Sequence, residues 1–567
     1  MGSNRLSHLI LFLLCIFMPV QAVQAEILYN PESGQFERQA DTFSPDQPSD
    51  WEIHAQYNEP NTVPNDRPPS SVEESGQKSS LPEKYDARDA GIITPVKQQL
   101  PYDTCWAQSA MNMAEANLIR KGIADPSLDL SELQVQYFTW HNPADPLGLI
   151  ADDRNIWTAY QLSEDAWRYW INSWGSAYRG IFILSSWRGP VLEQQAPYPA
   201  ADADIPGLKL KNELAYRKNY AHMQNAFWFP KSDRQTVKRM ILEYGSAILT
   251  YYSTRKPEFF NEETAAFYCP EKKGTNHLVS IIGWDDNYSR DNFSQNPGQD
   301  GAWLIKNSFG TEWGDQGYFW LSYADQTIHE DLFIYDFERA DNYDFNYQYD
   351  GALDYEYITV PGTTAIKAAN IFYAQHVELL SAVGYMSPSY NYSYTIKIYL
   401  NGDPGRPESG MLAAEVSGHQ PYAGYRTVRL PEPVQLTKGD RFSVVVNIYN
   451  TEMDKAYIMT DVSYTPSTKD FKGNSVTFLQ FLSHSYADDS FYFTEKAGWI
   501  DCYNEDPKKS LGNIRIKAYT NLNKTFDAKT PASGSQATKT LPLEQQPQFT
   551  LDPFSIELPE TGFRELD

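Results

Sequence analysis

The feature that most constrains this chain is a change in the pattern of its apolar residues between residues 340 and 350. From Leu81 to about residue 340, helical and strand patterns are mixed. Beyond that point, short runs such as "YTIKIYLNG", "RFSVVVNIYN" and "NIRIKAYTN" alternate between apolar and polar residues and are separated by turn residues. Such alternation predicts an all-β sandwich or barrel, because successive side chains of a strand lie on opposite faces. We therefore expect an α+β domain over residues 81–340 and an all-β domain over residues 350–521.

The first 25 residues carry an export pattern. Arg5 precedes the apolar run "LILFLLCIFMPV", which ends in "QAVQA" with the small residues Val23 and Ala25. This run is short for a bilayer span, and small residues at its exit are typical of signal-peptide cleavage. The alternative is a retained membrane anchor. We predict a signal peptide over residues 1–25 and a secreted or extracellular protein, with cell-surface association left open.

Two polar segments flank the predicted domains. Residues 26–80 are rich in Pro, Ser, Asp and Gln, and "NDRPPSSVEESGQKSS" is typical of a flexible linker. This segment is either a pro-region removed when a zymogen is activated or a plain spacer, and its composition favours neither. Residues 522–567 form a polar, Pro- and Gln-rich tail.

Charge and cysteine content exclude some classes of protein. The formal net charge of −26 opposes binding to nucleic acids and to anionic membranes. Cys15 would be removed with the signal peptide, which leaves Cys105, Cys269 and Cys502. An exported chain of this size with so few cysteines is not a disulfide scaffold. Whether Cys269 and Cys502 pair is left open.

Cys105 stands at the start of a predicted helix. Apolar residues recur along one face of that helix at Ala107, Ala110, Met111, Ala114 and Leu118. Asp103 and Thr104 are good N-cap types, and Gly122 is a typical stop signal. The positive end of the helix dipole should lower the pKa of a thiol in the first turn. The alternative is a buried, unreactive cysteine.

His277 and Asn307 are the candidate partners of Cys105. A nucleophilic thiol needs an imidazole that exchanges its proton and a group that orients the imidazole. His277 opens the apolar run "HLVSIIGW", which is typical of a buried strand. Asn307 ends a second apolar run and precedes a glycine-rich turn with aromatic residues. We predict a Cys–His–Asn site.

These motifs also resemble a known family. "LPEKYDARDAGIITPVKQQLPYDTCWAQSA", "NHLVSIIGW" and "KNSFGTEWGDQGYFWL" are similar, in this order, to three blocks of papain-like cysteine peptidases. The resemblance covers Leu81 to about Leu321 and implies a two-lobed peptidase fold.

The resemblance also implies a role for each matching residue. Cys105 would be the nucleophile, His277 its general acid and base, and Asn307 the group that orients the imidazole. The side-chain amide of Gln99 and the backbone N–H of Cys105 would form the oxyanion hole. The aromatic residues that would shield the His–Asn pair are Phe309 and Trp313. The family needs no metal or cofactor for this reaction, and the implied substrate is a protein or peptide.

The sequence departs from the family pattern near the nucleophile. Tyr102 stands where the family has a disulfide-bonded cysteine, and Leu100 and Asp103 replace two glycines. Long spacings imply insertions around residues 140–170 and 200–230, so specificity pockets do not transfer. The candidate cleft-wall residues are Asp103, Thr104, Gly175, Ser176 and Asn276.

The β segment over residues 350–521 resembles the lectin-like domain of bacterial cell-surface papain-type peptidases. This resemblance implies a cell-wall or glycan ligand, and exposed Tyr and Trp residues would stack on sugar rings. The alternative is that these aromatics fill the sandwich core. The acidic stretch "DNYDFNYQYD" offers oxygen ligands for calcium, although a solvated acidic linker is the simpler interpretation.

The tail contains "LPETG" at Leu558–Gly562, which resembles a sortase motif for cell-wall attachment. Only "FRELD" follows, without the apolar span and basic end of a complete sorting signal. We therefore favour a secreted or loosely associated protein over covalent attachment to the cell wall.

Three functions fit the sequence. The first is an exported cysteine endopeptidase with a C-terminal β domain for surface or substrate attachment. The second is a surface adhesin with a vestigial peptidase domain, and the third is a papain-like acyltransferase. All four residues that the chemistry needs are present, namely Gln99, Cys105, His277 and Asn307. This favours the first function over the second.

Overall fold

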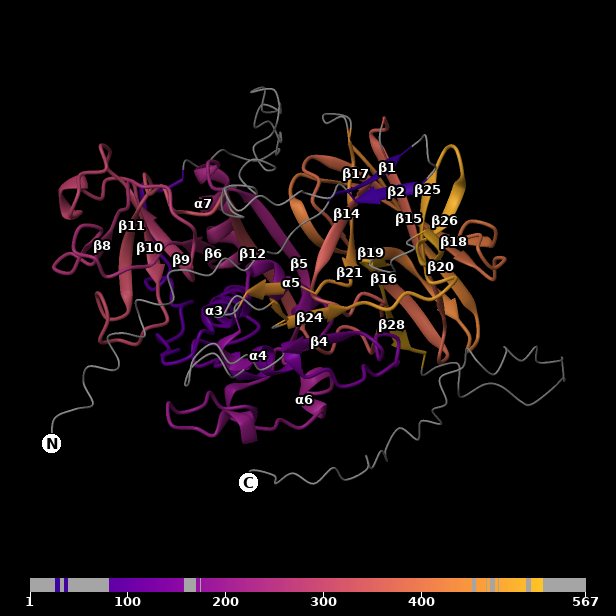
Figure 1. Cartoon of the computed structure of the whole chain (residues 1–567), viewed down its shortest axis with the longest axis horizontal. Helices are drawn as coiled ribbons and strands as arrows, with labels where there is room; N and C mark the ends of the chain where they lie inside the picture. Colours follow the sequence, from indigo (N-terminus) through magenta and orange to yellow (C-terminus); the bar gives the residue numbers. More distant parts are fainter. Residues whose placement is uncertain are drawn as a thin grey trace.

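Figure 1 shows the computed structural model of the chain, with residues 81–340 mainly on the left and residues 345–523 mainly on the right. The structure describes residues 26–30, 35–38, 81–157, 170–173, 175–360, 362–450, 455–465, 467–469, 475–477, 479–505 and 511–523. The predicted signal peptide and the LPETG motif lie outside these residues.

The peptidase half contains five of the helices that the structure describes. They are α3 (Cys105–Arg120), α4 (Glu132–Trp140), α5 (Ala177–Ser185), α6 (Glu213–Tyr216) and α7 (Arg234–Tyr244). The helix predicted after Cys105 is α3, and it is buried from Trp106 to Ile119. Gly122 follows it with a φ of +69°, which a glycine adopts without strain.

The largest sheet in the described part of the chain has 13 strands and runs through both halves. Eleven of its neighbours, in spatial order from the right of Figure 1, lead from the β half into the peptidase half. The strands in this order are β13 (Phe345–Tyr347), β28 (Ile516–Leu522), β16 (Glu378–Ser387), β19 (Ala423–Leu436), β5 (Ala221–Pro230), β12 (Asp331–Arg339), β6 (Ala247–Tyr251), β9 (His277–Asp285), β10 (Ala302–Lys306), β11 (Tyr318–Ser322), β8 (Ala266–Phe267) and β7 (Phe260–Asn261), and β3 (Lys84–Asp86) pairs with β9.

The two halves meet where β19 pairs with β5. The pairing is antiparallel and places Gly424 opposite Phe227. A Cβ atom on Gly424 would lie 1.9 Å from the carbonyl oxygen of Ala226, so only glycine permits this approach of the two backbones. The sheet therefore continues without a gap from the peptidase half into the β half.

The β half is a sandwich. Its second sheet consists of β18 (Met411–Gln420), β17 (Tyr392–Leu400), β20 (Arg441–Tyr449), β15 (Ala365–Tyr373), β25 (Ser490–Thr494) and β26 (Gly498–Asp501). Alternate residues of β15, β17 and β20 share one core with residues of β16, β19 and β28, including Ile366, Ile396, Val444, Val383 and Ile516. The predicted order, an α+β domain followed by an all-β sandwich, is confirmed, and the short helix α8 (Cys502–Glu505) is the only helix among the described residues of the sandwich.

A smaller sheet includes two strands from the segment predicted as a pro-region or linker. β1 (Glu26–Asn30) pairs with β2 (Gln35–Arg38) and, in parallel, with β14 (Tyr355–Thr359). β14 pairs in turn with β21 (Ile458–Val462), and β27 (Leu511–Ile514) completes the sheet. The sequence did not predict the two N-terminal strands, because their partner lies more than 300 residues later in the chain.

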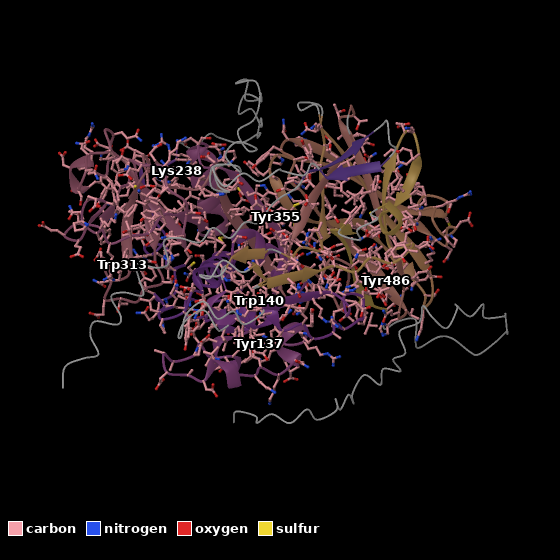
Figure 2. All side chains as sticks on the ribbon, in the orientation of Figure 1. Tyr137, Trp140, Lys238, Trp313, Tyr355 and Tyr486 are labelled. Carbon is pink, nitrogen blue, oxygen red and sulfur yellow. The ribbon has the colours of Figure 1, made fainter. Side chains whose placement is uncertain are left out.

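The predicted insertions supply the strands that join the two halves. β4 (Arg154–Trp157), from the first insertion, pairs with β24 (Leu479–Leu482) of the β half. β5, from the second, pairs with β19. Trp140, labelled in Figure 2, packs against Phe481 with ring centroids 6.0 Å apart. The two remaining small hairpin strands of the β half are β22 (Ser467–Lys469) and β23 (Ser475–Thr477).

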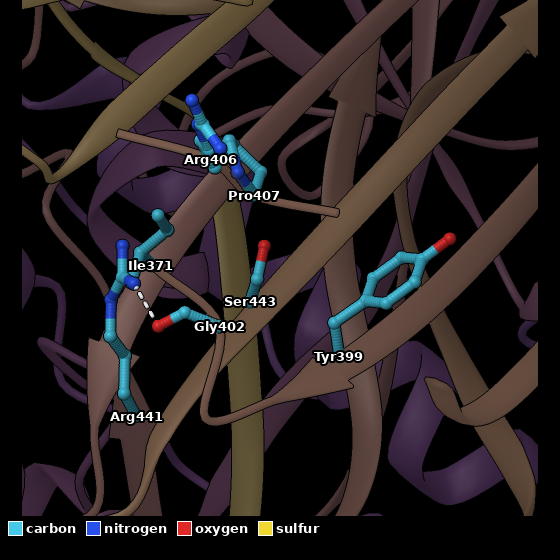
Figure 3. Close-up of a pocket in the computed structure, with 7 residues that line it drawn as sticks. All are labelled: Ile371, Tyr399, Gly402, Arg406, Pro407, Arg441 and Ser443. Atoms are coloured by element: carbon cyan, nitrogen blue, oxygen red, sulfur yellow. Dashed lines mark hydrogen bonds between the residues drawn. The ribbon is translucent and has the colours of Figure 1, made fainter. Parts of the chain in front are cut away.

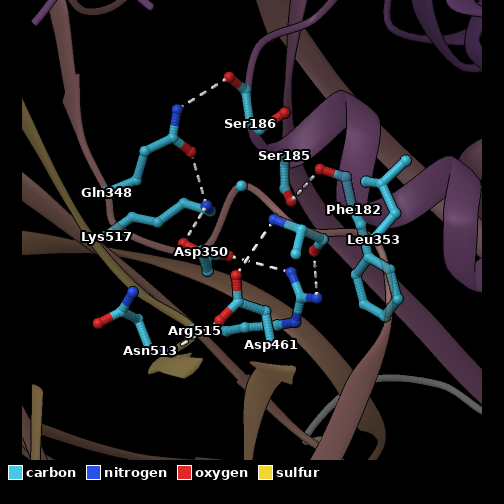
Figure 4. A network of polar contacts seen from close by, with 12 residues as sticks. Phe182, Ser185, Ser186, Gln348, Asp350, Leu353, Asp461, Asn513, Arg515 and Lys517 are labelled. Atoms are coloured by element: carbon cyan, nitrogen blue, oxygen red, sulfur yellow. Dashed lines mark hydrogen bonds and ion pairs between the residues drawn. The ribbon is translucent and has the colours of Figure 1, made fainter. Parts of the chain in front are cut away.

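A buried ion cluster lies at the same junction, as Figure 4 shows. Asp350 pairs with Lys517 at 2.7 Å and with Arg515 at 3.2 Å, and all three side chains are 1% exposed. Lys517 also donates to the side chain of Gln348, which donates to the Ser186 carbonyl of the peptidase half. The cluster thus connects strand β28 to the end of α5.

Two further sequence expectations concern cysteines and metals. Cys269 is buried and is a free thiol, so it does not pair with Cys502. In the part of the chain that the structure describes, no three His, Cys, Asp or Glu side chains gather as a metal site. Asp350, in the acidic stretch proposed for calcium, is instead paired with Arg515 and Lys517. Calcium binding stays a prediction without a site. The described helices also include none with the length and apolarity to cross a membrane.

Candidate active site

Cys105 is the first residue of α3 and is partly accessible. Its sulfur accepts hydrogen bonds from backbone N–H groups, including that of Leu278 on β9. This contact places the nucleophile helix directly against the start of β9, where His277 precedes Leu278. The structure therefore brings Cys105 to the strand that carries the predicted imidazole.

His277 is held by Asn307, as predicted. The imidazole Nε2 donates to Asn307 Oδ1 at 2.8 Å, and both side chains are buried. Because the amide oxygen accepts only, Nε2 carries the proton of this bond. Nδ1, the other ring nitrogen, is left for the sulfur. Asn307 lies just after β10, and its Oδ1 also accepts the backbone N–H of Ser308 at 2.8 Å, which fixes the amide.

Aromatic rings cover the His–Asn pair. The ring of Phe309 stacks on His277 with centroids 4.6 Å apart and an interplanar angle of 19°. Trp313, labelled in Figure 2, packs edge-on against Phe309 at 5.7 Å. Phe309 therefore contacts the imidazole directly, whereas Trp313 supports it from behind.

Gln99 is buried beside the nucleophile. Its Nε2 donates to the carbonyl of Tyr102 at 3.0 Å, and its Oε1 accepts from the hydroxyl of Ser308 at 2.7 Å. These bonds use one of the two amide hydrogens and fix the orientation of the amide. The second hydrogen remains available as a donor. The backbone N–H of Cys105 is in the first turn of α3, where N–H groups lack helical partners.

The predicted fall in the thiol pKa is wrong. Burial raises the pKa of Cys105 to about 11, and the carboxyl of Asp103 raises it further, although backbone N–H groups of the first helical turn oppose this shift. Burial lowers the pKa of His277 to about 4, while the bond to Asn307 raises it. In the free site, desolvation thus outweighs the helix terminus, and the resting thiol and imidazole are both uncharged.

Two of the candidate cleft-wall residues lie beside the nucleophile. Asp103 is partly exposed, and burial raises the pKa of its carboxyl to about 6. Its backbone N–H donates to Asn172 Oδ1 at 3.2 Å. A Cβ atom on Gly175 would lie 2.3 Å from the ring of Trp106, so the wall approaches the nucleophile helix only because residue 175 is glycine.

The other three candidates serve the local structure. Thr104 is fully buried and shares a hydrogen bond of 2.5 Å with Tyr198, so its side chain does not cap α3. Ser176 caps α5 by accepting the N–H of Arg179. Asn276 is exposed and bonds the backbone of Ser253 at both ends of its amide. None of these contacts reaches Cys105 or His277.

The sequence analysis missed two residues that position the site. Ser308 orients Gln99, and its place directly after Asn307 is the signal that could have identified it. The hydroxyl of Tyr198 bonds both Thr104 and the carbonyl of Gln99. Tyr198 lies about a hundred residues away in the chain, and no local pattern marks it.

Comparisons with known proteins agree with this geometry. A model of the papain family of cysteine proteases matches residues 81–137 and 164–333, and a lectin-like domain model matches residues 346–520. Bovine (Bos taurus) cathepsin S is 26% identical over 257 residues, which are 45% of this chain and 64% of that protein. Ananain from Ananas comosus is 25% identical over 244 residues, which are 43% of this chain and 56% of that protein. The chain thus spans less than two thirds of these relatives.

Solved structures match over both halves. The cysteine protease and lectin-like domains of Cwp84 from Clostridium difficile are 26% identical, with a TM-score of 0.62 over 79% of this chain and 90% of that one. Cwp84 after propeptide cleavage gives the same identity and TM-score over 78% of this chain and 99% of that one. Residues 81–333 therefore form a papain-family cysteine protease domain, and residues 346–520 form the lectin-like domain that follows it.

Proposed function

We propose that this chain is an exported cysteine endopeptidase that cleaves peptide bonds with Cys105, His277 and Asn307. The observation that carries the proposal is the meeting of three separate elements. The His277–Asn307 bond of 2.8 Å joins β9 to the end of β10, and the Leu278 N–H bonds the sulfur at the start of α3. A vestigial site would not be expected to keep the oriented amide of Gln99 as well.

The proposed reaction begins with attack of the Cys105 sulfur on the substrate carbonyl carbon while the thiol proton moves to Nδ1 of His277. This transfer creates two opposite charges side by side, and their attraction offsets part of the cost of charging either group in the buried site. The carbonyl oxygen becomes an oxyanion that accepts from Gln99 Nε2 and from the Cys105 N–H. Each such donor contributes roughly 10²–10³ in rate.

The tetrahedral intermediate then collapses. The bond between carbon and nitrogen breaks, and His277 returns its proton to the leaving amine. Water attacks the thioester with His277 as the base, which releases the carboxylic acid and restores the thiol. A primary amine in place of water would make the same site an acyltransferase.

Export and attachment are further parts of the proposal. The apolar run before Ala25 supports a signal peptide. Cwp84, the structural relative, is described as a surface-layer-associated protein, which supports a location outside the cell or on its surface. The lectin-like domain would then attach the enzyme to a glycan or to its substrate.

The role of residues 26–80 is proposed as that of a pro-region. The Cwp84 structure after propeptide cleavage is that of a processed protein, which supports processing here. N-terminal sequencing during activation should find a start near Leu81. A stable active form that starts near Glu26 would contradict the zymogen and indicate a spacer.

The purified chain is expected to cleave an unfolded protein such as casein under reducing conditions and to lose this activity after alkylation with iodoacetamide. Mass spectrometry of the products with and without a primary amine distinguishes the two chemistries. Products with new carboxylate ends indicate hydrolysis, and products joined to the amine indicate acyl transfer. An unalkylated chain that gives neither product would contradict the proposal and favour the adhesin.

Asn307→Ala is expected to move the alkaline limb of the pH–rate profile to lower pH. The Asn307 oxygen favours the protonated imidazole and raises the pKa of His277, so its loss lets the proton leave at lower pH. A hydrogen bond to a charged group is worth about 1.5–3 kcal/mol, and about 1.4 kcal/mol equals one pH unit. We expect a shift of about one unit or more in kcat/KM profiles.

Asn276→Ala is the matched control, because Asn276 precedes His277 but bonds only the backbone around Ser253 among its printed contacts. Its profile should equal that of the parent. Equal profiles for Asn307→Ala and the parent would contradict the role of Asn307.

A further inference from the structure

A small hollow lies on the outer face of the second sheet of the lectin-like domain (Figure 3). Its volume is about 160 Å³. Ile371 of β15, Tyr399 of β17 and Ser443 of β20 line its sheet side, and Arg441 starts β20 at its edge. The connection between β17 and β18 folds over it and contributes Arg406 and Gly402.

Arg441 has an incomplete set of partners. Its guanidinium is 92% buried by the side chains around it, since the residue is 8% exposed. Nη1 donates to the carbonyl of Gly402, but Nε and Nη2 have no hydrogen-bond partner. No acidic side chain of the described residues pairs with it. A buried cation without a partner is costly, so the arrangement indicates that an external group completes it.

Ser443 is a second unsatisfied group in the same hollow. Its side chain is 5% exposed, and its hydroxyl has no hydrogen-bond partner. Arg406 lies at the mouth, where its guanidinium is 75% exposed and only 4.0 Å from the equally exposed Asp403. The hollow therefore offers a buried fork, a buried hydroxyl and a mobile-ended cation from one side of the sheet.

The geometry of the free donors indicates the ligand chemistry. Nε and Nη2 form the side edge of a guanidinium, which binds two oxygens of one carboxylate or phosphate. Arg88 in this chain uses that edge, with Nε and Nη2 donating to the two carboxylate oxygens of Asp86 at 3.0 and 2.6 Å. At Arg441 the edge is present and the anion is not supplied by a described residue.

We propose that this hollow, the Arg441 pocket, binds a carboxylate or phosphate group carried on a glycan or polyol chain. The Arg441 side edge would hold two oxygens of the anion, and the Ser443 hydroxyl would donate to the same group. The ring of Tyr399 lies beside the hollow and would contact the adjoining carbons. This inference rests on the attachment role proposed for the lectin-like domain and names its site and ligand class.

The charge of the whole chain makes this proposal specific. At a net charge of −26 the protein repels anionic polymers in general. Binding of such a polymer would therefore depend on local contacts, and a single pocket predicts saturation at one site per chain.

The test is calorimetric titration of the full chain carrying Cys105→Ala, which prevents self-digestion. One probe is an oligogalacturonate, which carries carboxylates. Another is a glycerol phosphate oligomer, and the third is the methyl ester of the oligogalacturonate, which is neutral. We expect saturable binding of at least one charged oligomer and none of the ester. The oligomer that binds identifies the source of the anion.

Three variants assign the binding to the pocket. Arg441→Lys keeps the charge but loses the fork, and Ser443→Ala removes the hydroxyl. Each should weaken binding at least tenfold. Arg406→Gln, at the exposed mouth, should weaken it less and cannot disturb the core. Lys397→Gln is the matched control, since it removes a cation of the same sheet that pairs with Glu415 at 3.5 Å.

Two results would overturn the proposal. One is failure of both charged oligomers to bind the parent chain. The other is equal binding by the parent, Ser443→Ala and Arg406→Gln, which holds even if Arg441→Lys does not fold. Sedimentation with bacterial cell envelopes separates this outcome from failure of the attachment role. Envelopes that retain the parent and the variants equally would leave attachment standing and remove the pocket.

Discussion

Cys105→Ala is expected to abolish peptide-bond hydrolysis while the chain stays folded. The sulfur forms the covalent intermediate, and loss of the nucleophile in comparable triad peptidases costs on the order of 10⁶ in kcat. Alanine removes one partly accessible atom at the start of α3 and leaves the buried face of this helix unchanged. The measurement is the rate of casein cleavage, with thermal unfolding as the check on folding.

Cys269→Ala is the matched control for this variant. Cys269 is also a free thiol, but it is buried in the core of the domain, where its sulfur donates to the carbonyl of Glu271. The control should keep the parent's rate, with at most a loss of stability. Casein cleavage by Cys105→Ala at the parent's rate would contradict the assignment, as would loss of cleavage in a folded Cys269→Ala.

The parts of the site that the sequence predicts are those marked by local patterns. The apolar face after Cys105 becomes α3, and the apolar runs at His277 and before Asn307 become β9 and β10. Each run specifies its own element, and the chemistry of the residue at its end suggests the partner. The His277–Asn307 contact and the stacking of Phe309 follow from these elements.

The parts that the sequence does not predict depend on partners from distant segments. Thr104 seemed a helix cap, but Tyr198 takes its hydroxyl. Asn276 seemed part of the cleft wall, but Ser253 holds both ends of its amide. The thiol pKa was misjudged for the same reason, since the depth of burial is a tertiary property and outweighs the local helix terminus.

The fold shows the same division. Strict alternation predicted the strands of the β half but gave no information on their neighbours. The pairing of β19 with β5 depends on the absence of a side chain at Gly424, which one glycine among many in the sequence does not reveal. The insertions were recognised only as extra length, whereas in the structure they provide the strands that connect the two halves.

Asp350→Asn is expected to destabilise the junction between the two halves strongly. The substitution keeps the size of the side chain but leaves Lys517 and Arg515 charged, 1% exposed and without their carboxylate (Figure 4). Removing one partner of a buried ion pair costs about 3–5 kcal/mol. Urea unfolding of the Cys105→Ala chain, followed by tryptophan fluorescence, should show a clearly lower midpoint for the transition of the lectin-like domain.

Asp300→Asn is the control, because Asp300 pairs with Arg290 at 2.8 Å on the surface, where both side chains are more than 40% exposed. Its midpoint should equal that of the parent, since exposed ion pairs contribute little. A double variant, Asp350→Asn with Lys517→Met, should recover part of the loss because it removes one of the stranded charges. Equal midpoints for Asp350→Asn and the parent would show that the cluster does not stabilise the junction. No recovery in the double variant would assign the loss to Arg515, whose guanidinium also lies 3.9 Å from the ring of Phe182 in the peptidase half.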